Sequence, residues 1–314
     1  MLKSDTIHRG RIGQIPIYTG KFFRMFIFMD DWKVLPMAII ISGLVSVVAC
    51  SNMFKTMEGT LTGSLALVCV CIWNGFFNSV QAVCRERNVV KREHRAGLHI
   101  SSYIAAHMIY QGFLCFVQTA IMIVICRLTR MSFPEKGLIT PWFELEIGIT
   151  FFLITYAADM MSLFISCIVK NTTAAMTVMP FMLIVQLVFS GSLFTLSDGA
   201  DKFTGLTISK WGLNCLCAQA DYNSQPMVSV WNQLFKFREF QIQGMQPIKT
   251  LVDYMLDNDM VQQFCFITGS YSQKADYAAT AANVLSCWLH LAGFVVLFAA
   301  LAVLVLERID KDKR

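Results

Sequence analysis

GTLTGSLALVCVCIWNGFFNSVQAVC, residues 59–84, runs for 26 positions without Asp, Glu, Lys or Arg. A helix of this length, rising about 1.5 Å per residue, exceeds the roughly 30 Å hydrocarbon core of a bilayer. The next eleven residues, RERNVVKREHR at 85–95, include seven charged side chains. An apolar run that ends abruptly in charge is typical of a transmembrane helix that emerges into water.

Five more apolar stretches lie on either side of this one. Four contain no charged residue and the fifth contains one carboxylate, Asp159; the set is Val34–Phe54, Ala96–Cys126, Ile147–Val169, Asn171–Ser197 and Tyr277–Leu306. The whole chain of 314 residues is 55% hydrophobic and 15% charged, whereas a soluble domain has about 25% charged residues. Disordered chains lack this hydrophobicity, and outer-membrane barrels alternate apolar with polar residues. We therefore expect an all-α polytopic membrane protein with six transmembrane helices.

The segments outside these spans complete the predicted organisation. Tyr18–Trp32 mixes aromatic and charged residues, which predicts an amphipathic helix at the membrane interface; a cytosolic extension of the first span is the alternative. The charged segment after the second span suits a short exposed helix, or else a stop-transfer loop that only sets orientation. The predicted division is a cytosolic segment 1–33 with the interface helix, helices 1–5 over 34–196 with a charged helix at 85–97, a large external loop or cap at 197–277, helix 6 at 278–306 and a cytosolic tail at 307–314.

The distribution of Lys and Arg predicts the orientation. Sixteen of these residues fall in 1–33, 85–95, position 170 and 307–314, whereas the short loops of the other face carry four. Positive charge concentrates on cytosolic loops, so we expect both termini in the cytosol of a multi-pass cell-membrane protein. Topology and attraction to anionic lipid headgroups account for the net charge of +5, so no nucleic-acid partner is expected.

The sequence lacks the motifs of several enzyme classes. The nearest glycine pair to a P-loop, Gly59 and Gly63, is not followed by Lys. There is neither an HExxH zinc-protease motif nor a GxSxG nucleophile elbow. The five His residues do not fall at ligand spacing with acids or Cys, so no metal site is expected. We expect a chain that is not an enzyme and holds no cofactor of its own.

One face of the second span is polar. Asn74, Asn78 and Gln81 recur at i, i+4 and i+7 and are bordered by Phe77. Lipid disfavours such a face, so it should point to the bundle interior or to a dimer axis. It either lines a translocation cavity or forms hydrogen bonds to a neighbouring helix.

Asp159 is a carboxylate inside a span, with Thr155 one turn before it. An ionisable residue at such a position is a functional candidate. The pair is either a polar relay for substrate or gating, or a structural hydrogen bond to a neighbouring helix. In a channel or secondary transporter, Asp159 would be the ion or proton site.

Three segments, in this order, match one family pattern: NGFFNSVQAVCRERNVVKREHRAGLHISSY at 74–103, KNTTAAMTVMPFMLIVQLVFSGSLF at 170–194 and ISKWGLNCLCAQADYN at 208–223. They resemble the membrane domain of ABC exporters of the White (ABCG) type, in its bacterial form. The first is similar to the family's second helix, its charged helix and the start of its third. The second is similar to the fifth helix with its FSG ending. The third is similar to the segment that follows in bacterial members fused to an ATPase.

The resemblance implies roles for individual residues. Coupling to an ATPase is implied for four residues of the charged helix: Glu86, Arg87, Arg92 and Glu93. Substrate binding is implied for Asn74 and Phe77, with Asn78 and Gln81 on the same face. On the fifth helix, Ile184 and Leu187 would form an apolar wall, and Leu193 would be the gate. The family commonly has two leucines after FSG, whereas this chain has Ser192 and Leu193. The predicted gate is therefore weaker or built otherwise.

The resemblance also implies a function. The chain would be the permease subunit of an ATP-driven exporter, moving a hydrophobic or amphipathic substrate by alternating access through a cavity at the interface of a homodimer or heterodimer. Family members usually carry an ATPase domain on the same chain, and the sequence before 18–32 has none. ATP and Mg²⁺ would then bind a separate ATPase subunit. The alternatives are a channel or secondary transporter that is not of the ABC class, and a structural assembly factor.

The cysteines are unevenly placed. Eight of the eleven lie in or at the ends of spans, where they act as small apolar residues. Cys215, Cys217 and Cys265 lie in the predicted external segment. A disulfide between Cys265 and either Cys215 or Cys217 is one expectation, and three reduced thiols are the other.

Overall fold

The computed structural model describes residues 10–29, 31–49, 52–192, 202–241 and 246–308. Over these residues the chain is built of helices joined by turns and short 3₁₀ segments, without a β-strand. The all-α fold class is confirmed. The 3₁₀ segments are η1 (Asp31–Lys33), η2 (Tyr222–Ser224), η3 (Phe237–Glu239) and η4 (Ala275–Tyr277).

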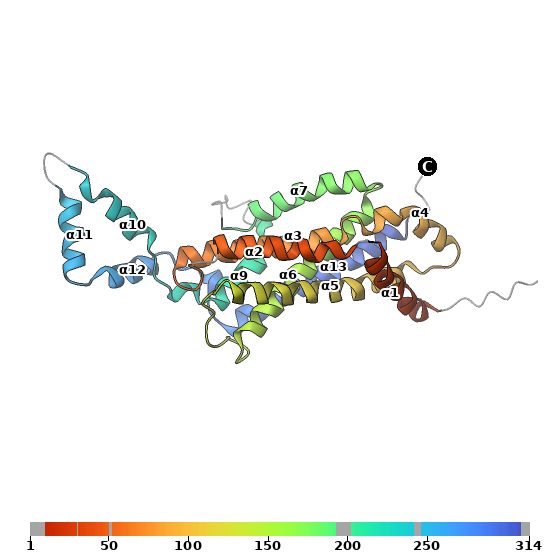
Figure 1. Ribbon diagram of the computed structural model, residues 1–314, viewed down its shortest axis with the longest axis horizontal. Helices are drawn as coiled ribbons and strands as arrows, with labels where there is room; N and C mark the ends of the chain where they lie inside the picture. The colour runs from red at the N-terminus through yellow and green to blue at the C-terminus, as the bar shows by residue number, and fades with distance from the viewer. Residues whose placement is uncertain (1–9, 30, 50–51, 193–201, 242–245, 309–314) are drawn as a thin grey trace, which may run out of the picture.

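Five helical stretches are long and apolar enough to cross a membrane: Asp31–Val48, Met57–Arg95, Ile100–Leu128, Phe143–Ile168 and Ala281–Leu306. They contain the helices that run along the long axis in Figure 1, namely α2 (Val34–Ala49), α3 (Met57–Ser79), α5 (Ile100–Leu128), α6 (Phe143–Ile168) and α13 (Ala281–Leu306). The remaining predicted span, the fifth along the chain, corresponds to α7 (Thr172–Val188), a shorter apolar helix of 17 residues. A polytopic membrane protein is confirmed, and the count of six spans stays a prediction.

Helix α6 is the centre of the bundle. In its most apolar 18-residue stretch, 72% of the residues are buried, whereas the corresponding stretches of the first and last spans are 17% and 28% buried. The α3 and α6 backbones meet at Gly75, where an added Cβ would lie 2.3 Å from the carbonyl oxygen of Thr155. Small residues allow membrane helices to approach this closely, because packing rather than water exclusion holds them together. The outer helices α2 and α13 are left with apolar faces that suit lipid.

Two shorter helices lie at one end of the bundle (Figure 1). Helix α1 (Arg11–Phe28) begins seven residues before the predicted interface helix and crosses the end of α5. It buries Phe22 and leaves Ile12, Ile27 and Phe28 exposed, as an interface helix with an apolar outer face would. Helix α4 (Ala82–Arg95) is the charged helix predicted after the second span. A turn at Gly97, with φ of 109°, separates α4 from α5.

The opposite end carries the segment predicted as an external loop. Helices α10 (Ser229–Lys236), α11 (Pro247–Asp257) and α12 (Val261–Ser270) extend beyond the bundle (Figure 1). Helix α9 (Ile208–Gln219) does not, because ten of its twelve residues are buried against α3, α6 and α13. Its sequence has a single charge, Lys210, so it suits the bundle better than water. The predicted loop 197–277 therefore combines an inserted helix with a helical cap.

Candidate translocation and coupling sites

An apolar groove of about 280 Å³ separates α3 from α7. Its walls come from Cys69, Ile72 and Trp73 on α3 and from Pro180, Leu183, Ile184 and Leu187 on α7. Ile184 and Leu187 are the residues predicted as the apolar wall. Trp73 is 41% exposed and packs against Phe77, with ring centroids 5.6 Å apart and ring planes tilted by 42°. Sequence reasoning missed Trp73, although it precedes Asn74 directly.

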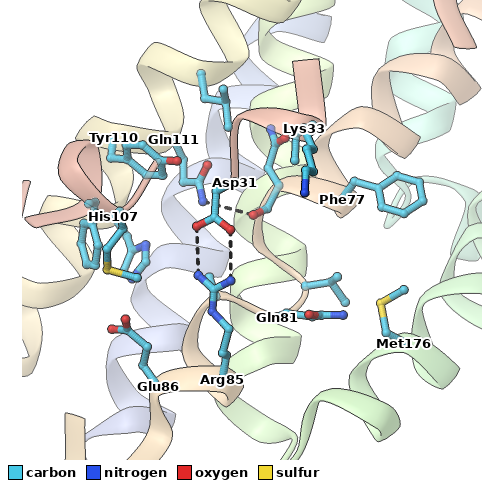
Figure 2. Close-up of a pocket in the computed structure, with 17 residues that line it drawn as sticks. Asp31, Lys33, Phe77, Gln81, Arg85, Glu86, His107, Tyr110, Gln111 and Met176 are labelled. Carbon is cyan, nitrogen blue, oxygen red and sulfur yellow. Dashed lines mark hydrogen bonds and ion pairs between the residues drawn. The ribbon is translucent and has the colours of Figure 1, made fainter. Parts of the chain in front are cut away.

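The predicted polar face of α3 does not line this groove. Asn74 is buried in the bundle. Asn78 and Gln118 of α5 exchange two amide hydrogen bonds of 3.0 and 2.9 Å. Phe77, Asn78 and Gln81 instead border a second, more polar cavity toward α4 (Figure 2). The contacts of Asn78 fit the hydrogen-bonding interpretation of this face, while Phe77 lines the cavity toward α4 and contacts Trp73 at the edge of the groove.

Asp159 joins three helices at the centre of the bundle. Ser79 of α3 donates a hydrogen bond to its Oδ1, and the Cys115 thiol of α5 lies 3.9 Å from its Oδ2. The carboxylate is fully buried. Thr155, the predicted partner, is buried one turn away and is not one of these two contacts. This arrangement fits the structural interpretation of Asp159.

Helix α4 is tied to α1 by charge. Lys21 Nζ lies 3.2 Å from Glu86 Oε2 and 3.7 Å from Glu93 Oε1. The Tyr18 hydroxyl donates to Glu93 at 3.2 Å. Burial and the adjacent Glu93 charge raise the pKa of Tyr18 to about 12. Two of the four predicted coupling residues, Glu86 and Glu93, therefore bind the interface helix.

The other two predicted coupling residues lie on different sides of α4. Arg87 donates to the carbonyl oxygens of Cys167, at 2.7 Å, and Val169, at 3.3 Å, at the C-terminus of α6. A cation at that position satisfies the last carbonyls of the helix and its dipole. Arg92 is exposed. Arg85, which was not singled out from the sequence, holds Asp31 by a bidentate ion pair of 3.0 and 2.9 Å.

The solvent-facing side of α4 is basic. Its exposed residues recur at helical spacing on one face: Arg85, Asn88, Arg92 and Arg95. The opposite side is anchored by buried Val83, Cys84 and Val90. The segment is thus a helix held between α1 and α6 with its outer face exposed. A stop-transfer loop that only sets orientation would not require these contacts.

The three cysteines of the predicted external segment are free in the structure. Cys217 packs with Met57, Leu213 and two tyrosines. Cys215, one half-turn away on α9, packs instead with Val284 and Cys287. Neither Cys215 nor Cys217 is bonded to Cys265 in the structure, and α9 directs its two thiols into separate hydrophobic clusters. The predicted gate residue Leu193 lies outside the described residues.

Comparisons with known proteins place these features in a family. The ABC-2 type transporter family matches residues 22–205, more than half of the chain. The ABC transporter ATP-binding/permease protein Rv1747 of Mycobacterium tuberculosis is 26% identical over 155 residues, which are 48% of this chain and 18% of that protein. The chain therefore aligns with less than a fifth of the relative's length. With several membrane-spanning helices and a match of this extent, the chain belongs to the ABC-2 type transporter family as a membrane permease domain.

Proposed function

We propose that this chain is the permease subunit of an ATP-driven exporter that works as a dimer with a separate ATPase subunit. ATP and Mg²⁺ bind that subunit, and the end of the bundle that carries α1 and α4 faces the cytosol of the cell. The observation that carries the proposal is the clamped position of α4, with Lys21 bound to Glu86 and Glu93 on one side and Arg87 bound to α6 on the other. The ATPase subunit would contact the exposed basic face of α4.

This arrangement gives a mechanical route from an ATPase to the bundle. A force on α4 is transmitted to α1 through the Lys21 carboxylate pairs and to α6 through the Arg87 carbonyl contacts. Helix α6 packs along α3 at Gly75, so it carries the displacement to the wall of the groove. Packed helices move as rigid elements, so a small shift at one end changes the width of a groove farther along.

The cargo path is proposed to lie along the α3–α7 groove. The exposed apolar residues beside it, including Trp73, Phe181 and Ile184, are 41%, 65% and 58% exposed. Helix α7 makes few contacts with its own bundle and leaves one face open, which a second permease, identical or related, would cover. A slot closed by aromatic and aliphatic side chains suits a hydrophobic or amphipathic substrate that enters from the membrane.

The alternative of an ion or proton site at Asp159 has less support. Its carboxylate is enclosed by Ser79 and Cys115, and these contacts join α3, α5 and α6. That position accounts for a buried carboxylate without an ion path. The relative named above is described as an ATP-binding/permease protein, which favours an ABC mechanism for this chain as well.

The test is ATP hydrolysis by the complex that this chain forms with an ABC ATPase, reconstituted in liposomes with a fluorescent amphipathic compound. We expect the chain alone to hydrolyse no ATP and the complex to show vanadate-sensitive activity that the compound stimulates. Trp73→Ala, which removes the aromatic wall of the groove, should abolish the stimulation while basal activity survives. The matched control is Phe298→Ala, which removes an aromatic ring from the α6–α13 contact. Full stimulation in Trp73→Ala would place the cargo path elsewhere.

A further inference from the structure

A cavity of about 240 Å³ near α4 is distinct from the α3–α7 groove. It is lined by residues of α1, η1, α2, α3, α4, α5 and α7, and among the described residues that line the two cavities none is shared. Figure 2 shows the Asp31–Arg85 ion pair across its middle, with His107, Tyr110 and Gln111 on one side and Phe77 and Met176 on the other. The cavity has a polar wall and an apolar wall.

The polar wall contains hydrogen-bonding groups that have no partner among the residues the structure describes. His107 is 3% exposed, and neither of its ring nitrogens has a partner among the described residues. Gln111 is 1% exposed; its Nε2 donates to the carbonyl oxygen of Asn78 at 3.5 Å, while its Oε1 has no partner in the described part of the chain. Leaving such groups desolvated and unpaired is costly, so natural proteins supply a partner from water or a ligand.

These two side chains are held in place rather than free to turn away. The His107 ring lies between Phe22, at a centroid distance of 3.9 Å, and Tyr103, at 4.7 Å. Gln111 follows one helical turn later on α5, so both point to the same side of the helix. A fixed pair of unsatisfied groups on a cavity wall is a preformed recognition element.

The missing partner must both donate and accept hydrogen bonds. Gln111 Oε1 requires a donor, and an imidazole offers one donor and one acceptor when neutral. A hydroxyl group meets both needs, whereas a quaternary ammonium meets neither. The charged residues at the rim occur in both signs, with Arg85 bound to Asp31 and Glu86 bound to Lys21. The rim therefore does not select for a strongly charged ligand.

We propose that this cavity binds the hydroxyl-bearing headgroup of a membrane lipid, with the hydroxyls at His107 and Gln111 and the start of the apolar tail along Phe77 and Met176. The volume exceeds that of a few waters, each of which takes about 30 Å³, and holds a headgroup rather than a whole lipid. The opening toward Met176, which is 40% exposed, lets the tail remain in the bilayer. This binding does not depend on whether the chain is part of an exporter.

Native mass spectrometry of the purified full-length chain tests the site with three probes: phosphatidylglycerol, monoglucosyl diacylglycerol and phosphatidylcholine. We expect the first two to bind at least about tenfold more tightly than the third, which lacks a hydroxyl donor. Binding of both supports recognition of hydroxyls alone, and binding of phosphatidylglycerol alone supports recognition of hydroxyls together with the phosphate. Equal binding of phosphatidylcholine, or retention of no lipid, overturns the proposal.

Two variants locate the bound lipid. The double substitution His107→Phe and Gln111→Leu keeps side-chain volume and removes the unsatisfied groups, and it should weaken binding at least about tenfold. Met176→Trp narrows the opening from an exposed position and should weaken binding without removing any polar group, so it decides the question if the double variant does not fold. The control His99→Phe alters an exposed His outside the cavity and should bind as the natural chain does. Unchanged binding in either test variant overturns the assignment.

Discussion

Lys21 Nζ and Glu86 Oε2 lie 3.2 Å apart although 65 residues separate them in the sequence. The lysine also reaches Glu93, at 3.7 Å, so a single side chain of α1 contacts two successive turns of α4. Partly exposed ion pairs of this kind contribute only about 0.2–1 kcal/mol each. Such pairs add little to the stability of the fold, and we propose that they couple the movement of α1 to that of α4.

The contact between Tyr18 and Glu93 should respond to alkaline pH. The pKa of Tyr18 is raised to about 12 in the folded chain, chiefly by burial and then by the Glu93 charge, above its ordinary value of 10.0. Because the folded state holds this proton more tightly, its contribution to stability is present below pH 10 and is lost as pH rises toward 12. Ultraviolet titration of the phenolate, compared between the natural chain and Tyr18→Phe, measures this pKa. Titration of Tyr18 near 10 would contradict the packing of α1 against α4.

Gly75→Ala should destabilise the bundle. The new methyl group would lie 2.3 Å from the carbonyl oxygen of Thr155 on α6, so the two helices must separate. Overpacking of this kind costs about 1–3 kcal/mol, seen as a lower midpoint in thermal unfolding of the purified chain. Gly43→Ala in α2 is the matched control, because nothing lies within 4 Å of its added Cβ. Equal midpoints for the two variants would argue against the close α3–α6 contact.

Two substitutions at Asp159 separate a structural role from an ion site. Asp159→Asn keeps an acceptor for Ser79 and should leave transport intact, with a change in stability within about 1 kcal/mol. Asp159→Leu leaves Ser79 and Cys115 without their acceptor and should cost about 1–3 kcal/mol. Transport and thermal unfolding are measured on both variants. Loss of transport in the Asn variant at unchanged stability would favour the ion or proton site.

The sequence was sufficient to predict the long apolar helices of the bundle and the charged helix α4. Apolar stretches long enough to cross a bilayer indicate the long helices, and the run of charges at 85–95 indicates α4. Both features are visible in short, continuous segments of the sequence. The family resemblance also implied an apolar wall from Ile184 and Leu187, and both residues line the α3–α7 groove.

What the sequence did not predict depends on contacts between distant residues. The polar face of α3 was visible in its spacing, yet its pairing of Asn78 with Gln118 joins residues 40 positions apart. Likewise, Glu86 and Glu93 share a helix face, but only the fold shows that Lys21 occupies it. The insertion of α9 was hidden by its place in a long segment whose average composition is moderately charged. Its own twelve residues, with one charge, carried the signal.

The most direct test of the central claim is the ratio of substrate transported to ATP hydrolysed in liposomes that contain the permease with its ATPase. The double substitution Glu86→Ala and Glu93→Ala removes the two α4 carboxylates that pair with Lys21 of α1. Asn88→Ala on the exposed face of α4 serves as the control. We predict that the double variant inserts and hydrolyses ATP but transports at least about tenfold less per ATP, a coupling loss of about 1.4 kcal/mol. A ratio equal to that of the natural chain and the control would contradict transmission through α4.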